Sequence, residues 1–535
     1  MVHVRSSSLT RLTIRGRTAY SMLLAMVSVL LVPMTLVVGA PAARADDVFT
    51  RPADGVWRVS GHGFGHGRGL SQWGSYGAAV AGVPWDQILS TYYPGTTRTT
   101  YPNNLIRVRL TVDSTQLRVS SSVGLVAVGA DGVVTALPPN ATQWRLVPTA
   151  TGQRLEALTD AWRPFPLSGT TDIRSWVRFE NSAKVLRLWR SGGTSVDYRG
   201  MAYGYAAAGF ISTVLHLPLE DYLRGVVPRE SPAAWPTEAL RAQTVAARSY
   251  GVAAQLRPAS SASDICDTTS CQVFGGTTSY STSGAATALE YASTNASIAD
   301  TAGVVLTYQG GIAFTEFSAS NGGWSTTGSK PYLVAKADPW SGLAPGDSVD
   351  TWSGVLRASD LEAQYPQIGT LTQLVVTQRD GNGDWGGRVL SARIDGTAGS
   401  VQVTGGAIMR ARPFPANSDG LRSNWFSLGS TLPFGNLDGT TWTGNALRVT
   451  GWTIDPDTAD PINIHVYLDG VNVRQATANT PRPDVAAYYP AYGPNHGYDL
   501  SLNAAPGTHQ VCTYAINTGA GAVNPQLGCR TITVP

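Results

Sequence analysis

The stretch that most constrains the fold of this chain spans residues 217–255. Its first part carries apolar residues at helical spacing, namely Leu219, Tyr222, Leu223 and Val226. We expect this short amphipathic helix to be interrupted by Gly225 and Pro228. Pro236 suits the first turn of a second helix, where the N–H that proline lacks would have no partner. The sequence therefore predicts a helix pair, whose second member covers about residues 237–255.

One carboxylate, Glu230, falls in the predicted connection between these helices. Pro228 and Pro232 flank it and stiffen its backbone. Residues 232–235 (Pro-Ala-Ala-Trp) offer an apolar wall that would raise the pKa of the carboxyl group. The start of the following helix would instead favour the anion. From these residues alone, Glu230 is either a solvated loop acid or a catalytic acid.

Several short motifs around Glu230 resemble the stage II sporulation protein D/amidase-enhancer family (SpoIID/LytB). They are Leu-Glu-Asp-Tyr-Leu at 219–223, Gly-Val-Val-Pro at 225–228, Glu-Ala-Leu-Arg-Ala-Gln at 238–243 and Ala-Arg-Ser-Tyr at 247–250. Characterised members are lytic transglycosylases that cut the glycan strand of peptidoglycan. The resemblance implies that Glu230 matches their catalytic glutamate, and that an α+β catalytic domain places β-sheets around the helix pair.

The reaction implied by this resemblance needs one carboxyl group and no cofactor. The group protonates the glycosidic oxygen and then accepts the proton of the sugar's own C6 hydroxyl, which gives anhydro-muramic ends. Most glycosidases use two carboxylates instead. Arg248, Tyr250 and Gln272 lie at family positions and are candidate substrate-binding residues. Arg248 could orient Glu230 or bind the glycan, and a solvated helix arginine is the alternative.

A second motif precedes the helix pair, at residues 61–74 (Gly-His-Gly-Phe-Gly-His-Gly-Arg-Gly-Leu-Ser-Gln-Trp-Gly). Its alternating glycines leave the backbone open to close approach by a polymer. Candidate substrate contacts here are His62, His66, Ser71 and Gln72. A His-x3-His pair can bind metal on a helix face, but glycine at every second position argues against a helix. We therefore expect substrate binding or structural hydrogen bonds rather than a metal site.

This second motif also resembles the same family, in which it usually closes the domain at the C-terminal end. Here it comes about 150 residues before the Glu230 segment and is followed by Tyr-Tyr-Pro-Gly at 92–95. The resemblance implies a circular permutation, which chains tolerate when their termini lie close together. We expect residues 46–100 to pack on a SpoIID-like domain at 101–430, with a helix at about 76–89.

The region after residue 100 is predicted to be rich in strands. The chain has 58 glycines, 32 prolines and only 14% charged residues, which favours loop-rich β structure. Alternating segments predict strands at 106–112, 123–134, 144–147, 176–179 and 185–189. A small-residue segment at 286–302 is expected to be helical. Ser320 and Asn321 occupy a family turn that could contact a sugar, although the acidic residue that follows in the family is absent here.

Residues 431–535 are predicted to form a separate all-β sandwich. Strongly alternating segments occur at 447–455, 462–470 and 509–514, and turn residues separate them. The region resembles accessory modules of exported cell-wall enzymes. A wall-binding role, a spacing role and a structural cap are all compatible with it.

The chain has four cysteines, which allow three pairings. Local pairing is the simplest, with disulfides Cys266–Cys271 and Cys512–Cys529. Some relatives of the resembled family bind zinc near the position of Cys266 through Cys and His together. Residues 264–271 contain no histidine, so we expect a disulfide rather than a metal site.

The N-terminus is predicted to be a signal peptide at residues 1–45. A basic region precedes uncharged residues 19–42, and Ala43-Arg44-Ala45 fits a small-x-small cleavage site. An uncleaved membrane anchor is the alternative. The segment holds five arginines and no acidic residue, so its removal changes the formal net charge from +3 to −2. No basic footprint for nucleic acid then remains.

Three functions fit these observations. The first is a secreted peptidoglycan lytic transglycosylase that cleaves MurNAc–GlcNAc linkages. The second is a non-catalytic enhancer that binds wall material and stimulates a cell-wall amidase, and the third is a plain wall-binding protein. Sporulation is an association of the resembled family, and these residues do not show it.

Overall fold

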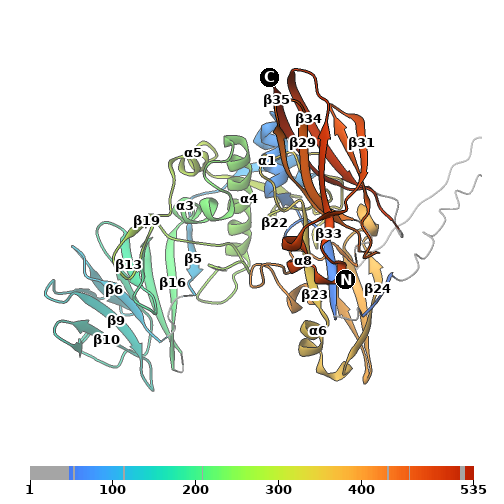
Figure 1. Ribbon diagram of the computed structural model, residues 1–535. Helices are drawn as coiled ribbons and strands as arrows, with labels where there is room; N and C mark the ends of the chain where they lie inside the picture. Colours follow the sequence, from blue (N-terminus) through green and yellow to red (C-terminus); the bar gives the residue numbers. More distant parts are fainter. Residues whose placement is uncertain are drawn as a thin grey trace, which may run out of the picture. The chain divides into compact units, whose positions relative to one another are not determined.

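The helix pair around Glu230 is present, but its first helix is longer than predicted. Helix α3 (Leu219–Glu230) includes Gly225 and Pro228 and ends at Glu230 itself. A Cβ atom at Gly225 would lie 2.5 Å from the ring of Phe274, so this glycine permits close packing inside the helix. Pro228 lies in the last turn of the helix. Its missing backbone N–H therefore removes few of the hydrogen bonds within the helix. Helix α4 (Thr237–Leu256) has the predicted bounds within one residue, and the pair lies side by side in Figure 1.

The computed structural model describes residues 47–51, 55–111, 115–207, 209–429, 433–456, 458–518 and 524–535. Met1–Ala45 and Asp46–Pro535 form two separate units. The predicted signal peptide lies outside the described residues. The boundaries expected at residues 100 and 430 stay predictions, because both fall inside the second unit. Among the described helices, none is long and apolar enough to span a membrane.

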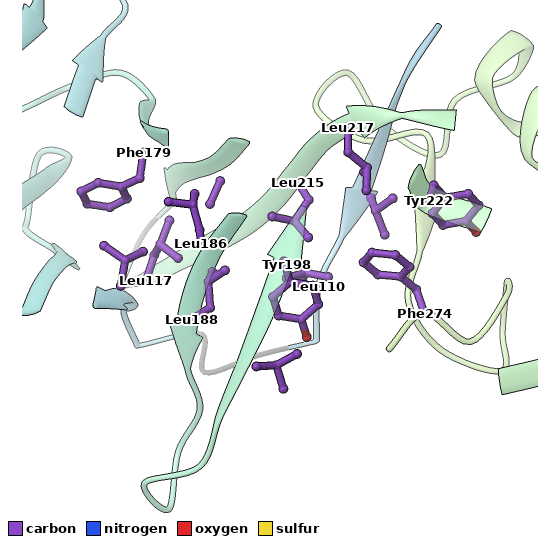
Figure 2. Packing of buried hydrophobic residues seen from close by; sticks show 14 of the residues in the cluster. Leu110, Leu117, Phe179, Leu186, Leu188, Tyr198, Leu215, Leu217, Tyr222 and Phe274 are labelled. Atoms are coloured by element: carbon purple, nitrogen blue, oxygen red, sulfur yellow. The ribbon is translucent and has the colours of Figure 1, made fainter. Parts of the chain in front are cut away.

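Two large sheets carry most of the predicted β region. They share one hydrophobic core, which reaches from Phe179 and Leu186 to Tyr222 of α3 and to Phe274 (Figure 2). The eight-stranded sheet has the order β11 (Trp162–Pro164), β10 (Gln153–Leu158), β9 (Gln143–Pro148), β6 (Leu117–Ser120), β13 (Val185–Trp189), β14 (Ser195–Arg199), β18 (Thr278–Tyr280) and β19 (Ala286–Ala288). The seven-stranded sheet has the order β17 (Ile265–Cys266), β5 (Leu105–Arg109), β16 (Phe210–Pro218), β15 (Met201–Ala207), β12 (Val177–Glu180), β7 (Val126–Gly129) and β8 (Val134–Ala136).

The N-terminal glycine-rich block packs on α4. Two short helices, α1 (Gln72–Val80) and α2 (Trp85–Tyr92), replace the single helix expected at 76–89, because Gly82 has positive φ between them. Buried side chains of the block meet small residues of α4 in one cluster. Helix α4 contributes Ala242, Val245 and Ala246 to it, and each is completely buried. These small residues let neighbouring backbones approach closely.

Strands from the N-terminal block pair with strands far away in sequence. Strand β2 (Val56–His62) lies between β23 (Thr351–Arg357) and β27 (Phe426–Leu428). Strand β3 (Leu70–Ser71) pairs in parallel with β22 (Phe317–Ser318). Strand β4 (Thr97–Thr100) joins β20 (Val304–Tyr308), which also pairs with β21 (Gly311–Ile312). The block is therefore built into the fold by backbone hydrogen bonds.

A further four-stranded sheet shares one core with two short helices and with the sheet that contains β2. Its strand order is β1 (Asp47–Thr50), β24 (Leu371–Arg379), β25 (Val389–Gly396) and β26 (Gly399–Thr404). The accompanying helices are α6 (Ala358–Gln364) and α7 (Gly405–Ala411). The helix expected at 286–302 is wrong in its first part, because β19 pairs with β18 there and α5 (Ala292–Asp300) begins later.

The C-terminal region contains two four-stranded antiparallel sheets that share one cluster of buried side chains, as in a β-sandwich. The first has the order β28 (Phe434–Trp442), β29 (Leu447–Ile454), β33 (Asn495–Leu502) and β32 (Thr480–Pro481). The second has the order β31 (Val471–Thr477), β30 (Asn463–Leu468), β34 (Gly507–Ala515) and β35 (Gln526–Val534). One helix, α8 (Pro483–Tyr488), lies between the last strands of the first sheet in sequence. The architecture of the described chain is α+β.

The packing of the N-terminal block on α4 predicts that Ala246→Leu destabilises the protein. The added methylenes have no space in the buried cluster, and overpacking of this kind costs about 1–3 kcal/mol. Urea denaturation of the two proteins measures the loss. Ala254→Leu, at a half-buried position of the same helix, is the matched control and should change the unfolding free energy little. Equal effects of both substitutions would contradict the proposed tight contact.

Candidate functional site

Glu230 lines a cavity of about 360 Å³ at the end of α3. Several parts of the chain, some of them far apart in sequence, meet around it. The glycine-rich block contributes His66, Arg68 and Gln72, and α4 contributes Tyr250. The remaining walls come from residues 269–271, from Val273 and from residues 316–319. The cavity is therefore created by tertiary packing rather than by one motif.

Both oxygens of the Glu230 carboxylate accept hydrogen bonds. Oε1 accepts the backbone N–H of Val273 at 2.9 Å, and Oε2 accepts the side-chain amide of Gln72 at 3.2 Å. Burial raises the pKa of Glu230 above its ordinary value of 4.5, although these two hydrogen bonds act in the opposite direction. A buried carboxyl group with a raised pKa at a cavity wall is suited to donate a proton.

The expected apolar wall at residues 232–235 is only partly buried. Pro232 and Ala234 are exposed, and only part of Trp235 is covered. The ring of Trp235 lies 4.9 Å from that of Trp73 and 5.1 Å from that of Tyr76. All three aromatic side chains are half-buried. In sequence, Trp235 follows Glu230, and Trp73 and Tyr76 follow Gln72.

Gln272 holds the loop that supplies the Val273 N–H group. It is completely buried, its Oε1 accepts the hydroxyl of Tyr222 at 2.9 Å, and its Nε2 donates to the carbonyl of Ala247 at 3.3 Å. The predicted substrate contact by Gln272 does not fit this placement, because its amide is satisfied inside the protein. Gln272 instead fixes the loop to both helices of the pair.

Ser71 is also enclosed. Its Oγ caps α1 by accepting the N–H of Gly74 at 3.1 Å, and it accepts the N–H of Asn321 at 3.3 Å. The Asn321 amide donates to Asp338 at 2.8 Å, and Ser320 Oγ accepts the N–H of Gly322 at 3.1 Å. All three predicted contacts, Ser71, Ser320 and Asn321, are at most 1% exposed. They hold the glycine-rich block against the 318–325 turn rather than face the cavity.

The two histidines of the block have different positions. His66 lines the cavity, and its Nδ1 accepts the N–H of Arg68 at 3.0 Å. Burial, with the nearby charges of Arg68 and Arg388, lowers the pKa of His66 to about 3. The ring is therefore neutral, and its Nε2–H is a hydrogen-bond donor.

His62 lies outside this cavity. Its Nε2 is 3.1 Å from Asp384, and its ring is 4.7 Å from that of Trp425. Burial lowers the pKa of His62 although Asp384 opposes the shift. The predicted contact of His62 with the same substrate as Glu230 is thus not supported by its position. Within the described ranges, no group of three His, Cys, Asp or Glu residues could hold a metal ion.

Arg248 was expected either to orient Glu230 or to bind the glycan, and the structure gives it neither position. Its side chain is completely buried and forms a bidentate pair with Glu220, with both N–O distances at 2.8 Å. Its remaining N–H groups donate to the carbonyls of Ile298 and Val304. Arg248 joins α4 to α3, to α5 and to the segment after α5, because a buried guanidinium requires partners on every side.

Tyr250 fits its expected role better. It lines the cavity, and its ring lies 4.4 Å from that of Phe314. Burial raises the pKa of Tyr250, and the nearby Glu316 and Glu230 carboxylates add to the rise. Its phenol therefore stays protonated and can donate a hydrogen bond to a ligand.

Sequence reasoning missed the pair formed by Arg68 and Glu316. The guanidinium of Arg68 donates to Glu316 Oε1 at 2.9 and 2.6 Å, and both residues line the cavity. A second carboxylate is therefore present, although its charge is balanced by Arg68. The position of Glu316 directly before the 318–325 turn was the available signal, but the family pattern directed attention to the residues after that turn.

The two predicted disulfides are present. Cys266–Cys271 closes the loop that precedes Gln272 and Val273, and Cys512–Cys529 joins β34 to β35. The first disulfide also lines the cavity through Cys271. It restricts the segment whose backbone N–H binds Glu230.

The placement of Arg248 predicts a loss of stability in Arg248→Met. Removal of the guanidinium leaves Glu220 without its charged partner, and a broken buried pair costs about 3 kcal/mol or more. Arg248→Lys keeps the charge but not the bidentate geometry, so its loss should be smaller. Urea midpoints measure both effects. Unchanged stability of Arg248→Met with weakened glycan binding would instead support the original expectation.

The raised pKa of Glu230 predicts how stability depends on pH. The folded protein favours the protonated group, so its stabilising contribution is complete below about pH 4.5 and is lost as the pH rises through the folded pKa. The Glu230→Gln variant does not lose stability in this way, because an amide does not titrate. The unfolding free energy of wild type minus that of Glu230→Gln should therefore fall as the pH rises from 4 to 7, as measured by urea denaturation.

Glu156 provides a control of opposite sign for this experiment. Burial alone would raise the pKa of Glu156, but hydrogen bonds from Arg145 and Arg154 lower it. The corresponding difference for Glu156→Gln should rise with pH. A flat profile for Glu230→Gln beside a rising profile for Glu156→Gln would contradict the raised pKa of Glu230.

Part of this chain is similar in sequence to known proteins. Residues 208–308 match the family model described as SpoIID, Stage II sporulation protein. The amidase enhancer of Bacillus subtilis (strain 168) is 40% identical over 122 residues, which are 22% of this chain and 15% of that protein. Stage II sporulation protein D is 34% identical over 146 residues in Bacillus amyloliquefaciens and 32% identical over 151 residues in Bacillus subtilis (strain 168). Each alignment covers 25% of this chain and 42% of the relative.

This chain thus spans less than half the length of each of these relatives. No solved structure matches it significantly. The matched segment contains α3, Glu230 and α4, which are the elements on which the cavity is built. In this segment, the chain is similar to the stage II sporulation protein D/amidase-enhancer family.

Proposed function

We propose that this protein is a secreted lytic transglycosylase that cleaves peptidoglycan glycan strands at MurNAc–GlcNAc linkages. The observation that carries the proposal is the Glu230 carboxyl group, which lines a cavity and has a pKa raised by burial. The similarity to an amidase enhancer and to stage II sporulation proteins supports a role at the cell wall. Export through residues 1–45 would bring the protein to that location.

The geometry is compatible with one group acting as both acid and base. In the first step the protonated Glu230 gives its proton to the glycosidic oxygen, and the bond to the muramic C1 breaks. The resulting carboxylate is stabilised by the Val273 N–H and the Gln72 amide, which already contact its oxygens. In the second step it accepts the proton of the C6 hydroxyl as that oxygen bonds to C1. The net reaction consumes no water.

Other residues of the cavity would bind the sugar. The neutral His66 offers an N–H donor, and Tyr250 offers a phenolic O–H donor. Hydrogen-bond donors of this type suit the hydroxyl and acetamido oxygens of an amino sugar. The Arg68–Glu316 pair adds charged groups to the cavity lining that could bind further oxygens.

An enhancer role is the second candidate, and the similarity to an amidase enhancer favours it. In that case the cavity would bind wall material without cleaving it, and a cell-wall amidase would be the partner. The C-terminal β region would then contribute to wall binding or present the partner surface.

Glu230→Gln should abolish glycan cleavage, because the amide cannot donate the proton. The experiment is digestion of purified glycan strands, with and without stem peptides, by residues 46–535 and by the variant. Mass spectrometry should find anhydro-ended fragments with the wild-type protein and at least about a hundredfold fewer with Glu230→Gln. Glu180→Gln, an acid outside the cavity, is the control and should cleave normally.

Other products would lead to other conclusions. Reducing-end fragments would show hydrolysis by water, in which Glu316 would be the natural second carboxylate. Absence of cleavage in wild type, with binding retained in both proteins, would refute the transglycosylase proposal in favour of the enhancer role.

A further inference from the structure

Trp73, Tyr76 and Trp235 form an aromatic cluster that the proposed reaction does not use. The ring of Trp235 lies 4.9 Å from that of Trp73 and 5.1 Å from that of Tyr76, and the rings of Trp73 and Tyr76 are 5.9 Å apart. All three residues are half-buried, so each keeps part of its surface exposed. Aromatic side chains that gather at a surface in this way favour an interaction site over a purely structural cluster.

The polar atoms of the three side chains are free to bind a ligand. Nε1 of Trp73, Nε1 of Trp235 and the hydroxyl of Tyr76 form no hydrogen bond within the described parts of the chain, and none of these atoms is enclosed without a partner. They are therefore accessible to solvent. Ring faces combined with accessible N–H and O–H donors suit a sugar, whose C–H face packs on an aromatic ring while its hydroxyl groups accept hydrogen bonds.

The aromatic cluster begins one helical turn from the side chain that contacts Glu230. Gln72 and Tyr76 are four positions apart on α1, so their Cβ atoms lie about 5–6 Å apart on one face of the helix. Gln72 donates to Glu230 Oε2 at 3.2 Å. From the other direction, Trp235 follows Glu230 by five positions, and five residues span at most about 18 Å. Two short segments thus connect the cluster to the carboxyl group.

The aromatic cluster lies outside the cavity that contains Glu230. None of its three residues lines this cavity of about 360 Å³ or a second cavity of about 680 Å³, which shares Tyr250 and Cys271 with the first. A cavity of the first size encloses a ligand of small-molecule dimensions. A polymer that is cut at Glu230 must therefore leave the cavity and continue over the surface beside it.

We propose that the aromatic cluster is a sugar-binding subsite, on which one N-acetylated sugar ring of the glycan strand stacks next to the linkage at Glu230. The inference rests on the proposed substrate, and it adds where the strand continues beyond the cavity. The subsite holds the strand through apolar ring contact and through three hydrogen-bond donors. Aromatic patches also occur in protein interfaces, but the connection to Glu230 through Gln72 favours the glycan.

The test measures binding by the Glu230→Gln protein, so that cleavage does not interfere. This protein is titrated calorimetrically with a peptide-free peptidoglycan tetrasaccharide. Addition of Trp235→Ala should weaken binding about tenfold, because stacking on a large ring is lost. Trp235→Phe keeps an aromatic ring and should weaken binding much less. The loss should persist at high ionic strength, because none of the three side chains is charged.

Trp162→Ala is the matched control. Trp162 is also half-buried, but it lies on β11 at the edge of the eight-stranded sheet, so its removal should leave binding unchanged. Direct contact is measured by fluorine NMR of protein labelled with 5-fluorotryptophan. The resonance that disappears in Trp235→Phe should shift when the tetrasaccharide is added, whereas the resonance that disappears in Trp162→Phe should not.

Three outcomes would overturn the proposal. Unchanged affinity in Trp235→Ala would refute the subsite and would favour a protein-binding role for the cluster. Reduced affinity without a shift of the Trp235 resonance would show that this side chain acts only through the fold. Absence of binding by the Glu230→Gln protein would also refute the subsite. A failure of wild type to cleave glycan would refute only the proposed reaction, because these measurements do not depend on catalysis.

Discussion

The enclosure of the Glu230 carboxyl group is the constraint on which the rest of the site depends. A buried carboxylate needs hydrogen-bond donors, and a buried acid must still reach its ligand. The structure meets both demands by ending α3 at Glu230, where Val273 and Gln72 provide donors and one cavity gives access. The two donors come from opposite directions in the chain. Any shift of either segment would change both the burial and the pKa of this group.

Helix α4 makes this arrangement possible because it offers small residues to the glycine-rich block. Ala242 and Ala246 allow α1 and α2 to pack closely, and this packing carries Gln72 to Glu230. Toward α3, the same helix uses a large residue instead of small ones. The buried side chain of Arg248 fixes α4 to α3 through Glu220. The block thus packs on α4 despite its early position in the sequence. The order of segments along the chain and their order in space are independent here.

The same packing explains why only some of the predicted site residues meet at one cavity. Residues of the glycine-rich block were grouped as one set of contacts, but His66 and Gln72 face the cavity whereas Ser71 is enclosed and His62 lies elsewhere. In this segment the side-chain direction depends on glycines with positive φ, such as Gly65 and Gly67, and no periodicity reports it. The Arg68–Glu316 pair was missed because its members are 248 positions apart. Two opposite charges that are so far apart in the sequence produce no local sequence pattern.

The sequence by itself determined the helix pair, the main strands and the local disulfides, and it singled out Glu230 as a candidate. Each of these rests on short-range spacing or on a contiguous motif. Such local features do not depend on contacts with distant parts of the chain. Tertiary structure alone decided that α3 continues through Pro228 and that Arg248 forms a buried ion pair with Glu220. It also decided that Tyr250 lines two cavities. The physical reason is that burial, charge pairing and cavity shape depend on which distant segments come together. Those are properties of the packed chain, and a linear pattern does not contain them.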